Sequence, residues 1–405
     1  MADKKNIRVL MLTTLAEVIG FGILIPIVPL MFVEPNSQFF ILPEMLSVEI
    51  GYILLGLLVG SYPLMQFFAT PILGELSDIY GRTRVIQVSI LGTVISTLVF
   101  AYALVTANLL ILFLSRLING LTGGLNSVVQ ASIADISNEE NKSKNLGKIG
   151  AVFGAGFVIG PFLGGLLSSG GFAVLGISTP FMFAAALSFA SLIFVSKELE
   201  ETSPMKEGTV NWLKPVSQVR KGLKLRGLKK LFATNFFYFS GFAFLTTFLS
   251  VVLVERFSFT QLEIGNTFLL VGLVIMFTQL VIIPKLFPRF QEEKVMPISL
   301  MLTGIAVLTL GFQSNVAIFL MIVAVFSMFN GITNISLETL VSRNASKNNQ
   351  GLALGTNQSL RSLANAGPSM LSGVAAALFT SSAPLHLSGA LMFLTGLAYY
   401  TTEHL

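Results

Sequence analysis

The chain has 405 residues, of which 53% are hydrophobic and only 11% charged, with a formal net charge of +5. Soluble domains carry about a quarter charged residues, so this composition excludes a soluble protein and predicts an integral membrane protein. Cysteine is absent, which excludes disulfides and thiolate metal sites. The two histidines, His386 and His404, lie near a span end and the chain end, so we expect neither a metal site nor a cofactor.

Twelve segments are long and apolar enough to cross a bilayer as helices, which takes about 20 mostly apolar residues. The first runs directly into the next spans and is too long for a cleavable signal peptide. The sequence therefore predicts an all-α membrane protein. The twelve predicted spans are residues 8–32, 51–72, 85–106, 108–134, 147–169, 179–196, 231–254, 264–284, 295–313, 315–340, 351–379 and 384–401.

The basic residues of the loops fall on one side of the predicted membrane. If residue 1 is cytoplasmic, nearly every loop Lys and Arg is cytoplasmic too, and Arg256 alone is outside. We therefore predict a multi-pass protein of the cell membrane, a bacterial inner membrane, with both termini cytoplasmic. The charges are spread over short loops that face anionic lipid, which argues against binding of nucleic acid.

A hydrophilic stretch at residues 197–230 divides the chain into six spans on each side. We predict an N-terminal bundle (1–196), a cytoplasmic linker (197–230) and a C-terminal bundle (231–405). Short matches relate the two bundles at a common offset: Glu-Ile-Gly at 49–51 and 263–265, "INGLT" (118–122) and "FNGIT" (329–333), and "GPFLGG" (160–165) and "GPSMLSG" (367–373). A parallel duplication of this kind is typical of transporters built from two six-helix halves.

The first span carries a single carboxylate, Glu17, in "AEVIGFGILIPIVPLM" (16–31). Counted from Arg8, Glu17 lies roughly 13 Å into the bilayer. An ionised carboxylate there costs on the order of 2.5–3.5 kcal/mol or more, and protonation relieves that cost. Glu17 is therefore a candidate proton carrier. The alternative is a protonated Glu that only hydrogen-bonds to a neighbouring helix.

The loop after the second span reads "GELSDIYGRTRV" (74–85) and resembles the G-x-L-a-D-r-x-G-r-k signature of the major facilitator superfamily. Ile79 replaces the usual basic residue, and Thr83 interrupts the final basic pair. The resemblance implies a cytoplasmic latch that stabilises one conformational state; a purely topogenic loop is the alternative. The proposed gating residues are Gly74, Asp78, Gly81, Arg82 and Arg84.

The fifth span matches the pattern G-x8-G-x3-G-P-x2-G-G of the superfamily's drug:proton antiporters. Small-residue packing explains the physics of such a helix, but the match implies export. The matching residues are Gly147, Gly156, Gly160, Pro161, Gly164 and Gly165. The first span also resembles a motif of tetracycline-type antiporters, with Glu17 where that motif has Asp; its other matching positions are Gly20, Gly22, Pro26 and Pro29.

Arg116 in the fourth span matches an Arg of a family motif. It needs a carboxylate, backbone carbonyls or water nearby, because a guanidinium keeps its charge. Two polar stripes on equivalent helices suggest a hydrated central cavity; polar contacts between helices are the alternative. The stripes are Arg116, Asn119, Gly123 and Ser127, and Ser327, Asn330, Asn334 and Glu338. The candidates for contact with substrate are Asn119, Tyr238, Asn330, Asn334 and Gln358. Arg361 fits an inner gate or a snorkelling side chain equally well.

Together these features predict a major facilitator fold: two six-helix bundles around a central cavity. We expect a monomeric drug:proton antiporter that exports small amphiphilic molecules by alternating access. Glu17 would carry the proton, Arg116 would tune or couple it, and the proton gradient would supply the energy. Alternatives are a proton-coupled nutrient symporter of the same fold and a non-transporting, carrier-like receptor. An enzyme is not expected, because the sequence offers neither a nucleophile–base pair nor a phosphate-binding loop.

Overall fold

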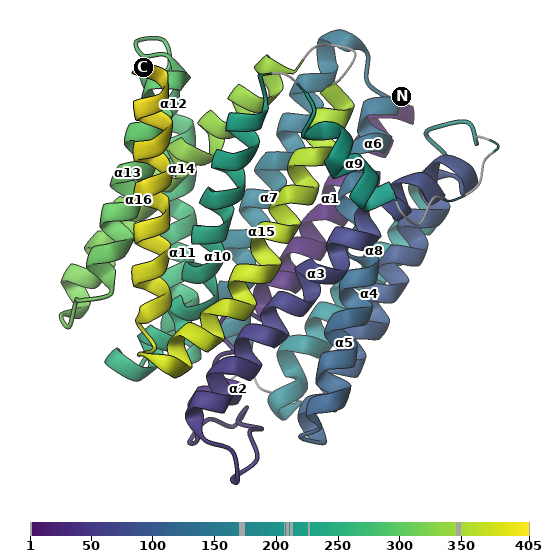
Figure 1. Ribbon diagram of the computed structural model, residues 1–405. Coiled ribbons are helices and arrows are strands. Elements are labelled where there is room, and N and C mark those ends of the chain that lie inside the picture. Colours follow the sequence, from purple (N-terminus) through teal and green to yellow (C-terminus); the bar gives the residue numbers. More distant parts are fainter. Residues whose placement is uncertain are drawn as a thin grey trace.

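The computed structural model is entirely helical over the residues that it describes, which are 2–169, 175–205, 207, 210, 214–225, 227–345 and 350–404. Both termini and the linker helix lie at one end of the bundle, and the 34–47 loop lies at the other (Figure 1). The N-terminal part contains α1 (Ala2–Ile23), α2 (Leu30–Val33), α3 (Val48–Tyr80), α4 (Arg82–Val105), α5 (Leu109–Thr122), α6 (Leu125–Asp135), α7 (Glu139–Ser168), the 3-10 turn η1 (Gly176–Ser178) and α8 (Thr179–Glu198).

The linker contributes one described helix, and the rest of the chain forms the second group of spans. The elements are α9 (Lys214–Gly222), α10 (Lys229–Phe257), α11 (Gln261–Phe277), the π-helix η2 (Thr278–Ile282), α12 (Ile283–Leu286), α13 (Glu292–Leu310), α14 (Val316–Asn344), α15 (Gln350–Leu378) and α16 (Ala383–His404).

The predicted all-α membrane fold is confirmed. Ten of the described helical segments are long and apolar enough to cross a membrane. The last two predicted spans form α15 and α16, whose 29 and 22 residues correspond to about 43 and 33 Å of helix, enough to cross the hydrocarbon. Several helices run past the apolar segments; α3 extends from Val48 to Tyr80, for instance, where the sequence predicts 51–72.

Two predicted spans are broken by turns, and a third, 264–284, changes to a π-helix at Thr278–Ile282. The first leaves regular helix at Ile23 and passes through turns before α2, because Pro26 and Pro29 cannot donate backbone hydrogen bonds to the preceding turn. The fourth divides into α5 and α6 at Gly123 and Gly124. The first span is thus bent as its prolines lead us to expect, whereas the break in the fourth is a finding of the structure.

α1 and α7 cross with their backbones in contact. A methyl group on Gly160 would lie 2.8 Å from the Cα of Gly22 and 2.8 Å from the carbonyl oxygen of Ile19. Gly156 and Gly164 on the same face of α7 approach α1 equally closely. Lipid gives helices little hydrophobic reason to associate, so such close packing of small residues is what holds them together.

Two pairs of helices join the N-terminal and C-terminal groups: α3 with α15, and α7 with α11. Near the 34–47 loop these pairs touch through their backbones, as at Gly56 with Gly373 and at Gly265 with Pro161. Towards the end with the termini, a methyl group added to any of four glycines of α3 and α7 would meet no described atom within 4 Å; they are Gly74, Gly147, Gly150 and Gly154. The two groups are therefore in contact at one end and separate towards the other.

A side-chain hydrogen bond reinforces the closed end. The hydroxyl of Tyr52 on α3 donates to the carboxylate of Glu255 at the end of α10. The Tyr52 ring also packs edge-on against Phe248, with 5.8 Å between the ring centroids. Since α3 and α10 belong to different halves of the chain, this bond links the halves directly.

Arg256 joins three helices of the C-terminal half at the same end. Its guanidinium donates to the backbone oxygens of Leu310, Gly311 and Gln313 at 3.1, 2.8 and 2.7 Å, and to Oγ of Ser382 at 2.5 Å. The three carbonyls lie where α13 ends and have no partner within that helix. The one loop cation on the predicted outer side is thus a structural clamp.

We expect Arg256→Gln to lower the stability of the protein, because hydrogen bonds from a charged group contribute about 1.5–3 kcal/mol. The measurement is the apparent melting temperature in detergent. Arg289→Gln, which removes the same charge from an exposed position, is the matched control. Equal melting temperatures for the two variants would show that the clamp contributes nothing.

Gly160→Val should also destabilise the protein, since overpacking typically costs about 1–3 kcal/mol and here the obstructing atoms are backbone. Gly150→Ala is the control, because its new methyl group meets open space. Thermal unfolding of both variants is compared with the wild type. A Gly160→Val variant as stable as Gly150→Ala would contradict the close α1–α7 crossing.

Candidate functional site

Glu17 lies on α1 between α4 and α8. The hydroxyl of Thr93 on α4 donates to its Oε2 at 3.0 Å. The buried hydroxyl of Ser188 on α8 faces the same carboxyl group. Oε1, however, is buried and accepts no hydrogen bond from the described residues. A carboxylate can accept several hydrogen bonds, so this setting satisfies the neutral acid better than the charged form.

Arg116 stacks on an aromatic ring instead of pairing with Glu17. Its guanidinium lies 5.1 Å from the centroid of the Tyr62 ring, and the residue is only 7% exposed. Among the described residues, no carboxylate comes within 4.0 Å of it. Phe21, one turn after Glu17, contacts the other end of the pair, with 5.4 Å between the Phe21 and Tyr62 centroids. Tyr62 is therefore a shared neighbour of Arg116 and of the α1 turn that carries Glu17.

The break between α5 and α6 is filled by a polar side chain from α3. Gln66 Nε2 donates to the carbonyl of Gly123 at 2.7 Å and to the hydroxyl of Tyr62 at 3.3 Å. Unwound backbone at membrane depth needs such a partner. Asn119, a predicted cavity residue, donates instead to Ser96 on α4 at 2.8 Å. For Asn119, the contact favours the alternative of a polar bond between helices.

The C-terminal half holds a second polar group. The hydroxyl of Tyr238 on α10 donates to Oδ1 of Asn330 on α14 at 2.7 Å, and both residues are buried. Asn334, one turn further, has a buried Oδ1 without a donor among the described residues. Gln358 is half-buried on α15. The structure thus joins two of the four predicted candidates of this half and leaves an unsatisfied acceptor beside them.

Arg361 on α15 connects this group to the end with the termini. Its guanidinium lies 4.1 Å from the centroid of the Phe239 ring and 3.7 Å from Oε1 of Glu338. The Glu338 side chain is 60% exposed, so the pair lies at the edge of the bundle core. Each half therefore places one arginine of a span over an aromatic ring.

The predicted gating loop is organised around Arg82. Its guanidinium contacts Asp78 at 2.7 Å, Asp135 at the end of α6 at 3.0 Å, and Oγ of Ser77 at 2.5 Å. Gly81 has φ +94°, a conformation that favours glycine. These contacts hold the ends of α3 and α6 at the start of α4.

Glu201, which follows α8 in the chain, caps the start of α4. Its carboxylate accepts hydrogen bonds from the backbone N–H groups of Arg82 and Thr83 at 2.9 and 3.1 Å, where α4 begins. A negative charge is favourable at a helix N-terminus. Gly74 has no neighbour within 4 Å and Arg84 is exposed. The described contacts of the motif thus lie within the N-terminal half and the linker, and its role as a latch remains a prediction.

The antiporter motif divides between two faces of α7. Gly156, Gly160 and Gly164 pack against α1, and Gly165 meets α11 near Gln261; Pro161 touches both helices, with its ring at Gly22 and its carbonyl at Gly265. Gly147 has no neighbour within 4 Å. The contact between the halves therefore involves Pro161 and Gly165, and the other glycines in contact hold the helix that carries Glu17.

Sequence reasoning missed Thr93, Tyr62 and Gln66. Gln66 could have been identified from the sequence, because a Gln recurs at a similar place in the second half. Tyr62 could have been suspected as an aromatic partner for a buried arginine. Thr93 had no signal, since hydroxyl residues are common in apolar spans and normally bond their own helix.

Comparison with known proteins agrees with this arrangement. The family model of the Major Facilitator Superfamily matches residues 10–368. The class G tetracycline resistance protein of Vibrio anguillarum is 30% identical over 356 residues, covering 87% of this chain and 86% of that protein. Multidrug resistance protein 1 of Bacillus subtilis (strain 168) is 28% identical over 375 residues, with coverage of 90% and 88%.

The fold agrees with solved structures as well. The crystal structure of the human organic anion transporter MFSD10 superposes with a TM-score of 0.72 at 23% identity, covering 98% of this chain and 99% of that one. At this identity the likeness concerns the fold alone. The family match, the tetracycline resistance relative and the helical architecture together show that the chain is a multi-pass membrane transporter for small molecules, not an enzyme, and that it belongs to the Major Facilitator Superfamily.

Proposed function

We propose that this transporter exports small amphiphilic molecules in exchange for protons, and that Glu17 carries the proton. The observation that carries this proposal is the environment of the Glu17 carboxyl group: it is buried, one oxygen accepts from Thr93, and two hydroxyls, those of Thr93 and Ser188, are its polar neighbours without any described cation. A group that is satisfied when neutral and costly when charged can release its proton only when water or another charge reaches it.

Alternating access is supported by the seam between the halves. α3–α15 and α7–α11 are tightly packed at one end, while glycines further along α3 and α7 have no neighbours. In the proposed cycle the two halves rock about these helices, so that the packed end opens as the other end closes. Access to Glu17 then alternates between the two sides of the membrane.

The proposed orientation places both termini in the cytoplasm of a bacterial cell, with the protein in its inner membrane. The termini and the linker helix share one end of the bundle (Figure 1), and the basic loops lie at that end. Positively charged loops remain on the cytoplasmic side. The packed end of the seam is then the outer end, and the structure corresponds to an inward-facing state.

The substrate class is proposed from the relatives and from the residues beside the seam. Proteins named for tetracycline and multidrug resistance are similar over most of their length. The polar group of the C-terminal half, with Tyr238, Asn330 and Asn334, offers hydrogen bonds from neutral side chains, with Arg361 and Glu338 as the nearby charges. We propose that a monomer suffices, with the proton gradient and no cofactor as the energy source.

Glu17→Gln should abolish proton-driven export and preserve exchange. The amide keeps an acceptor for Thr93 but cannot release a proton. The protein is reconstituted in liposomes, tetracycline and lipophilic cations are screened for movement against a pH gradient, and substrate–substrate exchange is measured in parallel. Uphill transport should fall to the level of empty liposomes, while exchange continues.

Two variants serve as controls for this experiment. Glu17→Asp introduces the residue that the tetracycline-type motif has at this position. It keeps a carboxylate, so export should still be coupled to protons. Glu49→Gln removes an exposed carboxylate at the start of α3 and should change nothing. Coupled transport by Glu17→Gln would show that another group carries the proton. If protons move in the same direction as the substrate, the protein is a symporter, as in the alternative interpretation, and not an exporter.

Tyr52→Phe should shift the population towards the state that is open at the outer end. The substitution removes only the hydroxyl that bonds Glu255 across the seam, a contact of the kind that contributes about 1.5–3 kcal/mol. Because the chain has no cysteine, a single introduced cysteine is the one thiol that can react, and its labelling rate measures how accessible that end of the seam is. Labelling of Met370→Cys, which packs against Gly60 at the closed end, should become faster by several-fold.

A second reporter makes this test specific. Gly74→Cys, at the open end of the seam, should label more slowly in the Tyr52→Phe background, because opening one end closes the other. General loosening of the structure would instead accelerate both reporters. Unchanged labelling at both positions would mean that the Tyr52–Glu255 bond does not hold the seam closed.

A further inference from the structure

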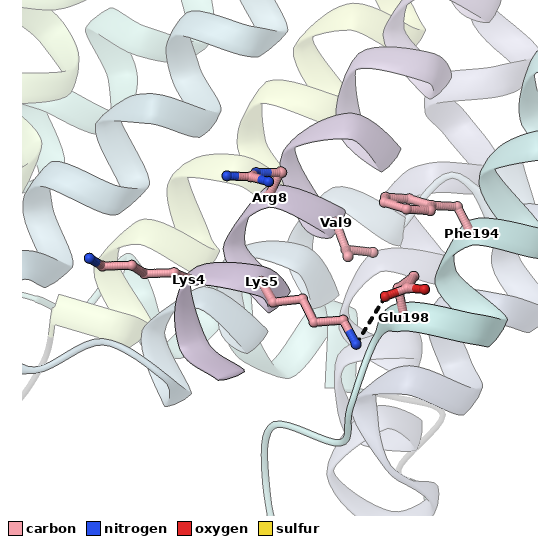
Figure 2. A pocket seen from close by; sticks show the side chains of 6 residues that line it. All are labelled: Lys4, Lys5, Arg8, Val9, Phe194 and Glu198. Carbon is pink, nitrogen blue, oxygen red and sulfur yellow. Dashed lines mark ion pairs between the residues drawn. The ribbon is translucent and has the colours of Figure 1, made fainter. Parts of the chain in front are cut away.

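A cavity of about 400 Å³ lies between the start of α1 and the end of α8. Figure 2 shows the six side chains that line it: Lys4, Lys5, Arg8, Val9, Phe194 and Glu198. It lies at the end of the bundle that carries the termini, away from Glu17 and from the seam. The transport cycle proposed above makes no use of it.

The charges around this cavity are only partly compensated. Lys5 Nζ lies 2.9 Å from Oε2 of Glu198, and Figure 2 shows the two side chains directed towards each other. Lys4 and Arg8 form no ion pair with any described residue, and both are exposed. They are four residues apart on one helix and therefore occupy the same face. Three cations and one carboxylate leave two positive charges for an anion.

The remaining lining is apolar and continues into the membrane. Val9 is buried at the base of the cavity, with Phe194 facing it from α8. One turn below Arg8 on the same face, Leu12 is 46% exposed. An anion-binding end followed by an apolar strip formed by Phe194 and Leu12 matches the shape of a phospholipid better than that of a free ion.

The start of α1 adds to the attraction for an anion. Lys4 and Lys5 lie within the first turns of this helix together with the carboxylate of Asp3, and the helix N-terminus carries the positive end of the helix dipole. Basic pockets between membrane helices on the cytoplasmic side favour anionic head groups. This step relies on the orientation proposed above, which places the cavity in the inner leaflet.

We propose that this cavity binds the phosphate head group of an anionic phospholipid. Lys4 and Arg8 contact the phosphate, the Lys5–Glu198 pair closes the α8 side, and an acyl chain follows the apolar strip past Leu12. Lipid bound here spans α1 and α8 at the end where these helices enter the membrane. The site therefore stabilises the bundle without contact with the transported molecule.

The test measures binding by thermal stability, without transport. Purified protein in a neutral detergent is titrated with short-chain phosphatidylglycerol, with phosphatidylcholine of the same chain length, and with inorganic phosphate. Phosphatidylglycerol should raise the melting temperature in a saturable manner, because a ligand that binds only the folded state stabilises it. The other two compounds should have little effect at the same concentrations.

The double variant Lys4→Gln/Arg8→Gln should bind phosphatidylglycerol about tenfold or more weakly, as expected for the loss of two charges near a lipid surface. Lys224→Gln/Lys294→Gln removes the same charge from exposed positions outside the cavity and should bind as the wild type does. Equal affinities for the two double variants would overturn the site. A response to inorganic phosphate equal to that to phosphatidylglycerol would overturn the lipid as its ligand. Either result leaves the test of proton coupling at Glu17 unaffected.

Discussion

The crossing of α1 over α7 is the contact on which the rest of the structure depends. Gly22 and Gly160 bring two backbones together where any larger side chain would force them apart. In lipid, where apolar surface alone gives helices little reason to associate, packing of this kind has to supply the cohesion. It fixes the height and the rotation of α1, and thereby directs Glu17 towards Thr93 and Ser188.

The two halves of the molecule satisfy their buried polar groups with different partners. In the N-terminal half, Arg116 rests on Tyr62, and Gln66 satisfies the unwound carbonyl of Gly123. In the C-terminal half, Tyr238 bonds Asn330, and an acceptor of Asn334 remains open. The N-terminal group suits control of a charge, while the C-terminal group suits recognition of a neutral hydrogen-bonding molecule. The division agrees with the proposed separation of proton and substrate binding.

The fold and the position of Glu17 could be predicted because hydropathy, loop charge and motif spacing depend on residues that are close together in the sequence. The six-residue pattern in the fifth span indicated where α7 would pack, although only the structure divides it between α1 and α11. The partners of the charged side chains could not be predicted, because they come from distant helices. Arg116 is predicted to tune Glu17 or to couple it to substrate, and the structure adds that it stacks on Tyr62. Asn119 is predicted to lie beside the substrate, and the structure adds its bond to Ser96; both roles stay predictions.

Helix α3 connects the seam to the candidate proton site. Its backbone meets α15 at Gly56 and Gly60, and Tyr62 follows within one turn. The Tyr62 ring contacts Phe21, the residue one turn from Glu17, and it also lies against the guanidinium of Arg116. Since α1 and α3 belong to the same half, they move together when the halves rock in the proposed cycle. Tyr62 therefore links the backbone contacts of α3 at the seam to the group of side chains around Glu17 and Arg116.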